Sequence, residues 1–246
     1  MNTPTLGDWL PAFFSYRQGV QLTLKLAPLP VTALSKSSKA WLHEHVTERY
    51  VRQAKQEGYR SRAAYKLLEL ARQDRLIRPG MTIVDLGAAP GGWSQVAAEL
   101  AGPKGRVVAV DILNMQAVRG VTFIQGDFRE DATLRALQDA LAGHQPDLVV
   151  SDMAPNISGI GMVDQVRASH LAELALEFAV KSLKPGGNFL VKGFQGEGYN
   201  ELRAELRRHF RQVLTRKPAA SRSRSSEMYL LAKDLIPRPT ADSSAA

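Results

Sequence analysis

The chain has 246 residues, a formal net charge of +8 and 44% hydrophobic residues, which suffices for one globular core with short extensions. The absence of cysteine excludes a disulfide scaffold, a Cys-ligated zinc or iron–sulfur site and any thiolate nucleophile, including that of RNA base methylases that attack a pyrimidine through Cys. No stretch reaches the roughly 18 consecutive apolar residues of a membrane span. Asp8 precedes any basic residue, unlike in a secretory signal. We expect a soluble, cytoplasmic protein.

The positive charge is concentrated in two segments. Residues 35–66 carry eight Lys and Arg against three Glu, and residues 200–224 carry eight against two. The two net charges are therefore +5 and +6, which leaves −3 for the rest of the chain. One basic run is typical of a solvated helix face, but two runs beside a mildly acidic body favour a polyanionic partner such as a nucleic acid. We expect the two segments to form one continuous surface that faces RNA.

The chain divides into three predicted regions. Residues 1–34 are poorly patterned and are expected to form an N-terminal extension. Residues 1–30 are expected to lie outside the functional protein, and a start at Val31 is favoured over a transit peptide because the segment has only one Arg and one Ser. Residues 35–234 are expected to form the main domain, which opens with two basic helices, one after Ser38 and one through residues 63–70. Residues 235–246 are expected to be a flexible tail.

From Thr82 onward, predicted strands alternate with predicted helices. The strands are 82–86, 106–111, 121–125, 147–152, 188–194, 212–216 and 227–232, and the helices are 93–100, 132–141, 166–183 and 200–210. Apolar strands that alternate with helices predict a parallel sheet covered on both faces. The last two strands are joined by a segment too short for a crossover helix, so they pair antiparallel. The predicted fold is α/β, a doubly wound, Rossmann-like, mostly parallel seven-stranded sheet with one antiparallel strand.

A glycine-rich turn follows the first strand and opens a helix. It reads Asp85-Leu86-Gly87-Ala88-Ala89-Pro90-Gly91-Gly92-Trp93 and lies where open α/β sheets bind ligands. The Ala-Ala-Pro after Gly87 breaks the G-x-G-x-x-G register of dinucleotide sites, which argues against a pyrophosphate. Asp85 instead suits a cation such as a sulfonium amino acid.

Carboxylates also end the next two strands. Asp111, 24 residues after Gly87, is placed to accept both hydroxyls of a ribose, and Asp127 is placed to accept an exocyclic amino group. Each Asp alone is more often a turn former or a helix cap. Together with the glycine turn, these residues predict a pocket for S-adenosylmethionine.

Four ionisable residues are expected to meet at the same edge of the sheet. Asp152 ends the fourth strand, Lys192 lies in the fifth, Glu227 begins the antiparallel last strand and Lys66 lies on a preceding helix. Such residues are usually solvated, but an unpaired ammonium within the apolar strand of Lys192 would be costly. Asn156 follows Pro155 where amino-group methylases carry an aromatic residue against a flat base. This difference favours a ribose hydroxyl as the acceptor.

Residues 35–233 resemble the FtsJ/RrmJ family of ribosomal RNA methyltransferases. The motifs that carry the resemblance lie at 60–63, 85–95, 151–156, 194–198 and 221–227. It implies S-adenosylmethionine-dependent 2′-O-methylation of a uridine ribose in the A-loop of large-subunit (23S) rRNA, on the assembled large subunit. The resemblance also implies a catalytic tetrad of Lys66, Asp152, Lys192 and Glu227. It further implies cofactor contacts from Gly91, Trp93, Asp111, Asp127 and Asp152. The chain departs from the family at Gly193, where members carry a larger residue, and in residues 1–34, which have no counterpart.

The implied reaction is an in-line displacement in which the 2′-oxygen attacks the sulfonium methyl group and Lys192 takes or guides the hydroxyl proton. A neutral base and a charged orienting donor both stay open for Lys192. Two other functions also stay open: 2′-O-methylation of tRNA or of an mRNA cap, and a non-catalytic RNA-binding role in ribosome assembly, which the tetrad disfavours. The expected partner is large-subunit rRNA or the large ribosomal subunit, with no metal, no membrane and a monomeric chain.

Overall fold

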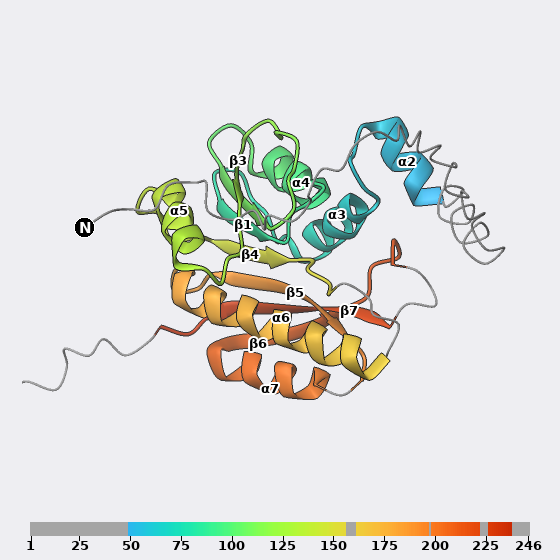
Figure 1. The fold of residues 1–246 in the computed structure, drawn as a ribbon, viewed down its shortest axis with the longest axis vertical. Helices are drawn as coiled ribbons and strands as arrows, with labels where there is room; N and C mark the ends of the chain where they lie inside the picture. The colour runs from blue at the N-terminus through green and yellow to red at the C-terminus, as the bar shows by residue number, and fades with distance from the viewer. Residues whose placement is uncertain (1–48, 156–160, 197, 222–225, 238–246) are drawn as a thin grey trace, which may run out of the picture. The chain divides into compact units, whose positions relative to one another are not determined.

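The computed structural model describes residues 49–155, 161–196, 198–221 and 226–237 (Figure 1). In chain order these residues form α2 (Arg49–Glu57), α3 (Ala63–Asp74), β1 (Thr82–Leu86), α4 (Gly92–Ala101), β2 (Arg106–Asp111), β3 (Val121–Gln125), α5 (Asp131–Leu141), β4 (Leu148–Ser151), α6 (Gly161–Ser182), β5 (Asn188–Phe194), α7 (Tyr199–His209), β6 (Phe210–Arg216) and β7 (Glu227–Leu235). The predicted N-terminal extension and the start of the first basic helix lie outside the described residues, as do Arg222 and Arg224. No described helix is both long and apolar enough to cross a membrane.

The strands form one seven-stranded sheet in the order β3-β2-β1-β4-β5-β7-β6. β7 runs antiparallel to both of its neighbours, and the other neighbouring strands are parallel. The predicted fold class is confirmed. The sheet order reverses between β1 and β4, which is where open α/β sheets bind their ligands.

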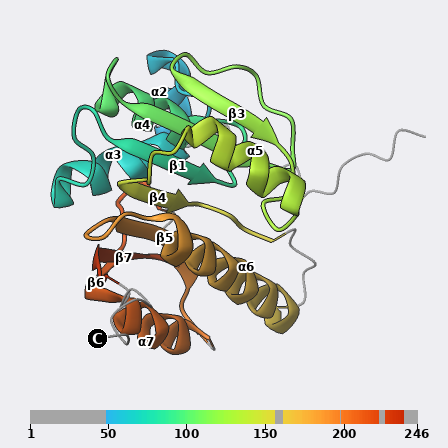
Figure 2. The ribbon, with the colours of Figure 1, turned by 90° about the vertical axis from the view of Figure 1, so that its left-hand side faces the viewer.

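Helices cover both faces of the sheet (Figures 1 and 2). α3 and α4 pack on one face, and α5, α6 and α7 pack on the other. Side chains alternate between the two cores along each strand, so Ile83 contacts the α3 and α4 side whereas Val84 and Leu86 contact the opposite side. Burial on both faces explains why these strands are continuously apolar.

Tertiary packing moves several element boundaries away from those predicted. α6 begins at Gly161 instead of 166, because its first turns carry exposed Val163 and no apolar stripe that would reveal them. β6 begins at Phe210, which the sequence assigned to a helix; this ring is buried and stacks on Phe189 at 6.4 Å between ring centroids. β7 continues to Leu235, a buried residue one position beyond the predicted domain boundary at 234.

Candidate active site

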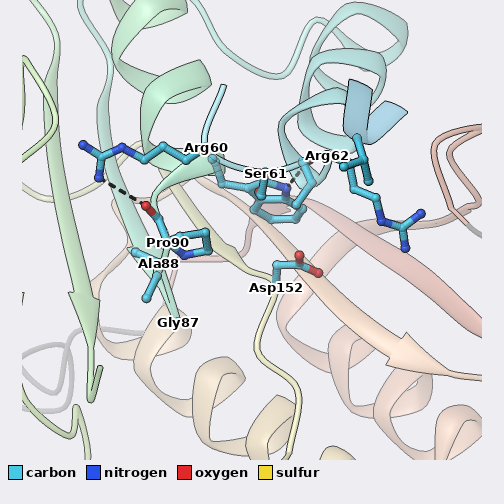
Figure 3. Close-up of a pocket in the computed structure, with 12 residues that line it drawn as sticks. Arg60, Ser61, Arg62, Gly87, Ala88, Pro90 and Asp152 are labelled. Carbon is cyan, nitrogen blue, oxygen red and sulfur yellow. Dashed lines mark hydrogen bonds between the residues drawn. The ribbon is translucent and has the colours of Figure 1, made fainter. Parts of the chain in front are cut away.

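A cavity of about 350 Å³ opens at the carboxyl ends of β1 and β4, a size typical of small-molecule sites. Its walls come from α2, from the segment between α2 and α3, from the glycine turn and from the start of α4 (Figure 3). The lining residues are Val51, Arg60, Ser61, Arg62, Ala63, Gly87, Ala88, Ala89, Pro90, Gly92, Trp93 and Asp152. The predicted glycine turn therefore borders a ligand-sized space.

Close packing explains the glycines of the turn. A Cβ atom at Gly87, whose φ is +75°, would lie 2.2 Å from Met153 Cγ, and one at Gly92 would lie 2.4 Å from Ser61 Oγ. Gly91 has a φ of +108° and connects Pro90 to Gly92, both of which line the cavity. A larger residue at these positions would displace the cavity walls.

Trp93 lines the cavity and also contacts the ring of Tyr229. Its indole Nε1 donates a hydrogen bond to the Ala63 carbonyl oxygen at 2.8 Å, which ties α4 to the start of α3. The Trp93 ring lies 5.7 Å from the Tyr229 ring between centroids. The side chain is 3% exposed, so its position is fixed by packing on both sides.

The two predicted strand-end carboxylates differ in their surroundings. Asp111 accepts backbone hydrogen bonds from Ala89 and Leu113, each at 2.8 Å, and so holds the end of β2 against the glycine turn. Asp127 is paired with the guanidinium of its neighbour Arg129, whose Nε donates to both carboxylate oxygens at 2.9 Å. The hydrogen bonds from Arg129 lower the pKa of Asp127. Asp127 is therefore ionised, and its carboxylate is engaged within its own loop.

Asp85 and Ser61 carry polar atoms that lack a partner. Asp85 is 1% exposed, and burial raises its pKa to about 7 although Ser94 Oγ donates to Oδ2 at 2.6 Å. Asp85 Oδ1 and the cavity-lining Ser61 Oγ are buried, and neither has a hydrogen-bond partner among the described residues. Buried polar atoms are nearly always paired in folded proteins. Because Ser61 lines the cavity, its lack of a partner is the pattern expected of a site that binds a polar ligand.

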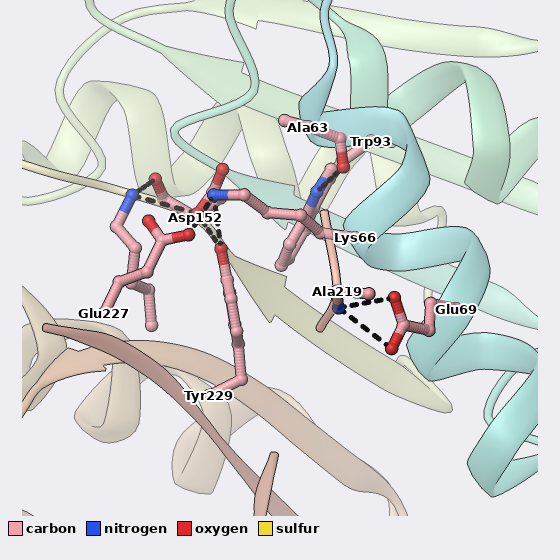
Figure 4. A network of polar contacts seen from close by, with 9 residues as sticks. Ala63, Lys66, Glu69, Trp93, Asp152, Ala219, Glu227 and Tyr229 are labelled. Atoms are coloured by element: carbon pink, nitrogen blue, oxygen red, sulfur yellow. Dashed lines mark hydrogen bonds and ion pairs between the residues drawn. The ribbon is translucent and has the colours of Figure 1, made fainter. Parts of the chain in front are cut away.

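Asp152 lies at the centre of a buried polar cluster (Figure 4). Lys192 Nζ and the Tyr229 hydroxyl both donate to Asp152 Oδ1, at 2.9 Å and 2.7 Å. Lys66 Nζ donates to the Tyr229 hydroxyl at 3.1 Å and lies 2.8 Å from Glu227 Oε1. The structure thus brings together the four residues of the predicted tetrad.

Opposite charges balance in this cluster, which allows it to be buried. Lys66, Glu227 and Lys192 are 5%, 8% and 9% exposed. Burial alone would raise the pKa of Asp152, but attraction to Lys192 and Lys66 and the hydrogen bonds from Tyr229 and Lys192 lower it below its ordinary value. Buried charges are costly unless paired, and such costly groups beside a cavity are typical of functional sites.

Sequence reasoning missed three contributors to the site. Tyr229 joins Asp152 to Lys66, and its position two residues after Glu227, on the same side of the strand, is the signal that could have revealed it. Ser61 lines the cavity. Arg60 donates from its two terminal guanidinium nitrogens to the carbonyls of Gln116 and Ala117, each at 2.6 Å, and fixes the segment after β2 beside the glycine turn.

A doubly wound sheet with a glycine turn and a ligand-sized cavity where the strand order reverses defines the Rossmann-like class of cofactor-dependent enzymes. The model of the FtsJ-like methyltransferase family matches residues 59–235. The chain therefore belongs to the FtsJ-like methyltransferase family, which confirms the resemblance drawn from the sequence. Methyl transfer requires a methyl donor.

Curated relatives and a solved structure agree with this assignment. The chain is 62% identical over 197 residues to Ribosomal RNA large subunit methyltransferase E of Nitrosospira multiformis, with 80% of this chain and 96% of the relative covered. It is 62% identical over 196 residues to the protein of the same name from Alkalilimnicola ehrlichii, covering 80% and 94%. The crystal structure of a ribosomal RNA methyltransferase from Plasmodium falciparum has a TM-score of 0.66 and 30% identity, covering 73% of this chain and 100% of that one.

Proposed function

We propose that the chain transfers a methyl group from S-adenosylmethionine to a ribose 2′-hydroxyl of large-subunit rRNA, specifically a uridine of the A-loop in the assembled subunit. The observation that carries this proposal is the Lys192–Asp152 ion pair, whose carboxylate partner lines the cofactor-sized cavity. The names of the relatives support rRNA as the substrate class. The basic residues of α7 and of the N-terminal helices agree with a polyanionic substrate.

The residues that line the cavity, together with Asp111 and Ile112 outside its lining, fit S-adenosylmethionine. Unpartnered Ser61 Oγ and the start of α4 supply a hydroxyl and a positive helix end for a carboxylate. Asp111 still has acceptor capacity for ribose hydroxyls beyond the two amides it binds. The side chain of Ile112, next in sequence, is 63% exposed and supplies an apolar surface for a purine. When bound, this cofactor supplies an electrophilic methyl group on a sulfonium sulfur.

The chain's own residues prepare the acceptor hydroxyl. Lys192 Nζ donates to both the side chain and the backbone carbonyl oxygen of Asp152, which fixes two of its three hydrogen-bonding directions. The third direction holds an N–H in the charged form, which orients the hydroxyl, or a lone pair in the neutral form, which takes its proton. Tyr229 acts as a positioning residue because its hydroxyl holds Asp152 directly, and Lys66, which is paired with Glu227, in turn holds the Tyr229 hydroxyl.

The proposal is tested by labelled methyl transfer to large ribosomal subunits that lack the modification, followed by mapping of the methylated nucleotide. Wild-type protein should label one ribose of large-subunit rRNA, and assembled subunits should be better substrates than free rRNA. tRNA and capped mRNA serve as competing acceptors. The proposal would be contradicted if the labelled methyl group were found only on tRNA or capped mRNA, or on a base instead of a ribose.

Matched variants separate chemistry from cofactor binding. Lys192→Ala should abolish turnover while calorimetry shows an unchanged affinity for S-adenosylmethionine. The same change at exposed Lys181 of α6 serves as its control. Asp111→Ala should weaken cofactor binding first, about ten-fold or more if two charge-assisted hydrogen bonds are removed, and Asp139→Ala on exposed α5 surface is its control. Residual turnover of Lys192→Ala would remove Lys192 from the mechanism.

A further inference from the structure

A second cavity, of about 230 Å³, lies at the same edge of the sheet as the first. It is lined from the segment after β4, from α6, from the end of β5 and from the residue before β7 (elements in Figure 2). The lining residues are Ala154, Pro155, Asp164, Gln165, Ala168, Phe194, Gln195 and Ser226. The cofactor assignment above uses none of them.

The second cavity borders the catalytic cluster along three strands. Ala154 lies two residues after Asp152, Phe194 lies two residues after Lys192, and Ser226 directly precedes Glu227. Phe194 and Glu227 are register partners, and the Gln195 amide donates to the Ser226 carbonyl oxygen at 2.9 Å. Asp152 itself lines the first cavity. The cluster residues therefore adjoin both cavities, since Asp152 lines the first and the residues that line the second follow or precede Asp152, Lys192 and Glu227 along the chain.

The lining combines a flat apolar surface with groups that can read a polar edge. Phe194 supplies an aromatic ring, and Pro155 and Ala168 supply aliphatic surface. The Gln195 side-chain amide is both a donor and an acceptor, and the Ser226 hydroxyl is as well. Asp164 contributes a carboxylate, which disfavours a phosphate and favours a ligand edge that bears N–H groups. These features match a nucleobase better than any other part of an RNA.

We propose that this second cavity holds the base of the acceptor nucleotide, turned out of the RNA so that its ribose reaches Lys192 and Asp152. The inference rests on the proposed function. Enzymes that recognise RNA bases stack unpaired bases on aromatic side chains and read their edges with hydrogen bonds. The aromatic ring can stack on any base, and the polar side chains of the lining determine which base is preferred.

Two variants change the lining of the base cavity and leave every residue of the cluster unsubstituted. Ala154→Leu adds bulk from an exposed position of the cavity wall, and Phe194→Leu keeps apolar volume but removes the aromatic ring. Ala136→Leu adds the same bulk at an exposed position of α5 and is the matched control. Thermal unfolding verifies that each variant is folded. Methyl transfer is measured with unmethylated large subunits, and cofactor affinity is measured by calorimetry.

Both cavity variants should lower kcat/KM for the ribosomal substrate about ten-fold or more, as expected when one base no longer stacks, with cofactor affinity unchanged. Values within two-fold of the Ala136→Leu control would overturn the base cavity while leaving the proposed function intact. An equal loss of cofactor affinity would overturn it too, since the cavity would then belong to the cofactor site. If wild-type protein labels no ribose, the proposed function fails and the base cavity fails with it.

Discussion

Tyr229→Phe removes one oxygen atom from the middle of the buried cluster. That oxygen donates to Asp152 Oδ1 at 2.7 Å and accepts from Lys66 Nζ at 3.1 Å, and the Tyr229 side chain is fully buried. Hydrogen bonds to charged groups contribute about 1.5–3 kcal/mol each. Because the cluster can relax in part, we expect the free energy of unfolding to fall by roughly 2–3 kcal/mol at pH 7.

The loss should depend on pH because it acts through Asp152, whose pKa is lowered in the folded protein. A lowered pKa contributes stability above the unfolded value of about 3.9, and that stability is lost as the pH falls through the folded value. Without the Tyr229 donor the folded pKa of Asp152 rises. The difference between wild type and variant should therefore be largest near neutral pH and shrink below about pH 4. The acid limb of the methyl-transfer profile should move to higher pH.

Tyr199→Phe is the matched control for this prediction. Its hydroxyl lies 3.0 Å from the neutral Thr215 Oγ1, away from the charged cluster. We expect a loss of about 1 kcal/mol that does not change with pH. Urea unfolding of wild type and both variants from about pH 7 down to about pH 2.5 provides the measurement, because the decrease expected for Tyr229→Phe lies below about pH 4. If the two losses have the same pH dependence, Asp152 does not receive the Tyr229 hydrogen bond as a carboxylate, and the charge assignment of the cluster is wrong.

Three further predictions concern buried Asp85, the cavity-lining Arg60 and the basic segment before β7. Burial raises the pKa of Asp85 to about 7, and Asp85→Asn removes this titrating carboxyl group. In the absence of cofactor, the wild-type protein should therefore lose stability relative to the variant as the pH rises from about 4 to 7. Unfolding curves recorded without cofactor check this. Arg60→Lys cannot reproduce the paired contacts to Gln116 and Ala117, so calorimetry should show cofactor binding weakened about ten-fold. Reversal of Arg222 and Arg224 to Glu should weaken RNA binding and reduce its salt dependence by roughly one unit of slope for each phosphate that is no longer bound; an unchanged slope would exclude phosphate binding there.

The sequence predicted the sheet well wherever burial on both faces dictates residue type. β1, β2, β3 and β5 have the predicted bounds because their apolar runs end at turn residues or carboxylates. The predicted boundaries are wrong where contacts with residues distant in the sequence determine the secondary structure. Phe210 fits the apolar period of α7, but its pairing with Leu235 and its stacking on Phe189 place it in β6. No local pattern contains that information.

In the candidate site, too, some residues could be predicted from the local sequence and others only from contacts in the folded protein. Strand ends alone placed Asp152 and Glu227 at one edge, and the cost of an unpaired ammonium in an apolar strand pointed to Lys192. Tyr229 was not predicted because a buried aromatic in a strand is typical of a core, and only the distances to Asp152 and Lys66 show its polar role. The assignment of Gly91, Trp93, Asp111 and Asp127 to the cofactor stays a prediction. A bound adenine would have to share the Asp127 carboxylate with Arg129 or displace the Arg129 guanidinium from it.

The position of β7 in the chain links the synthesis of this strand to activity. β7 lies between β5 and β6, and β6 joins the sheet only through it. Glu227 and Tyr229 both belong to β7, so a growing polypeptide in which β1 to β5 have already paired still lacks two members of the buried cluster. Until β7 inserts, Lys66 has neither of its two partners. A chain synthesised only as far as β6 contains every residue that lines the cofactor cavity but an incomplete buried cluster, so activity requires the synthesis of β7.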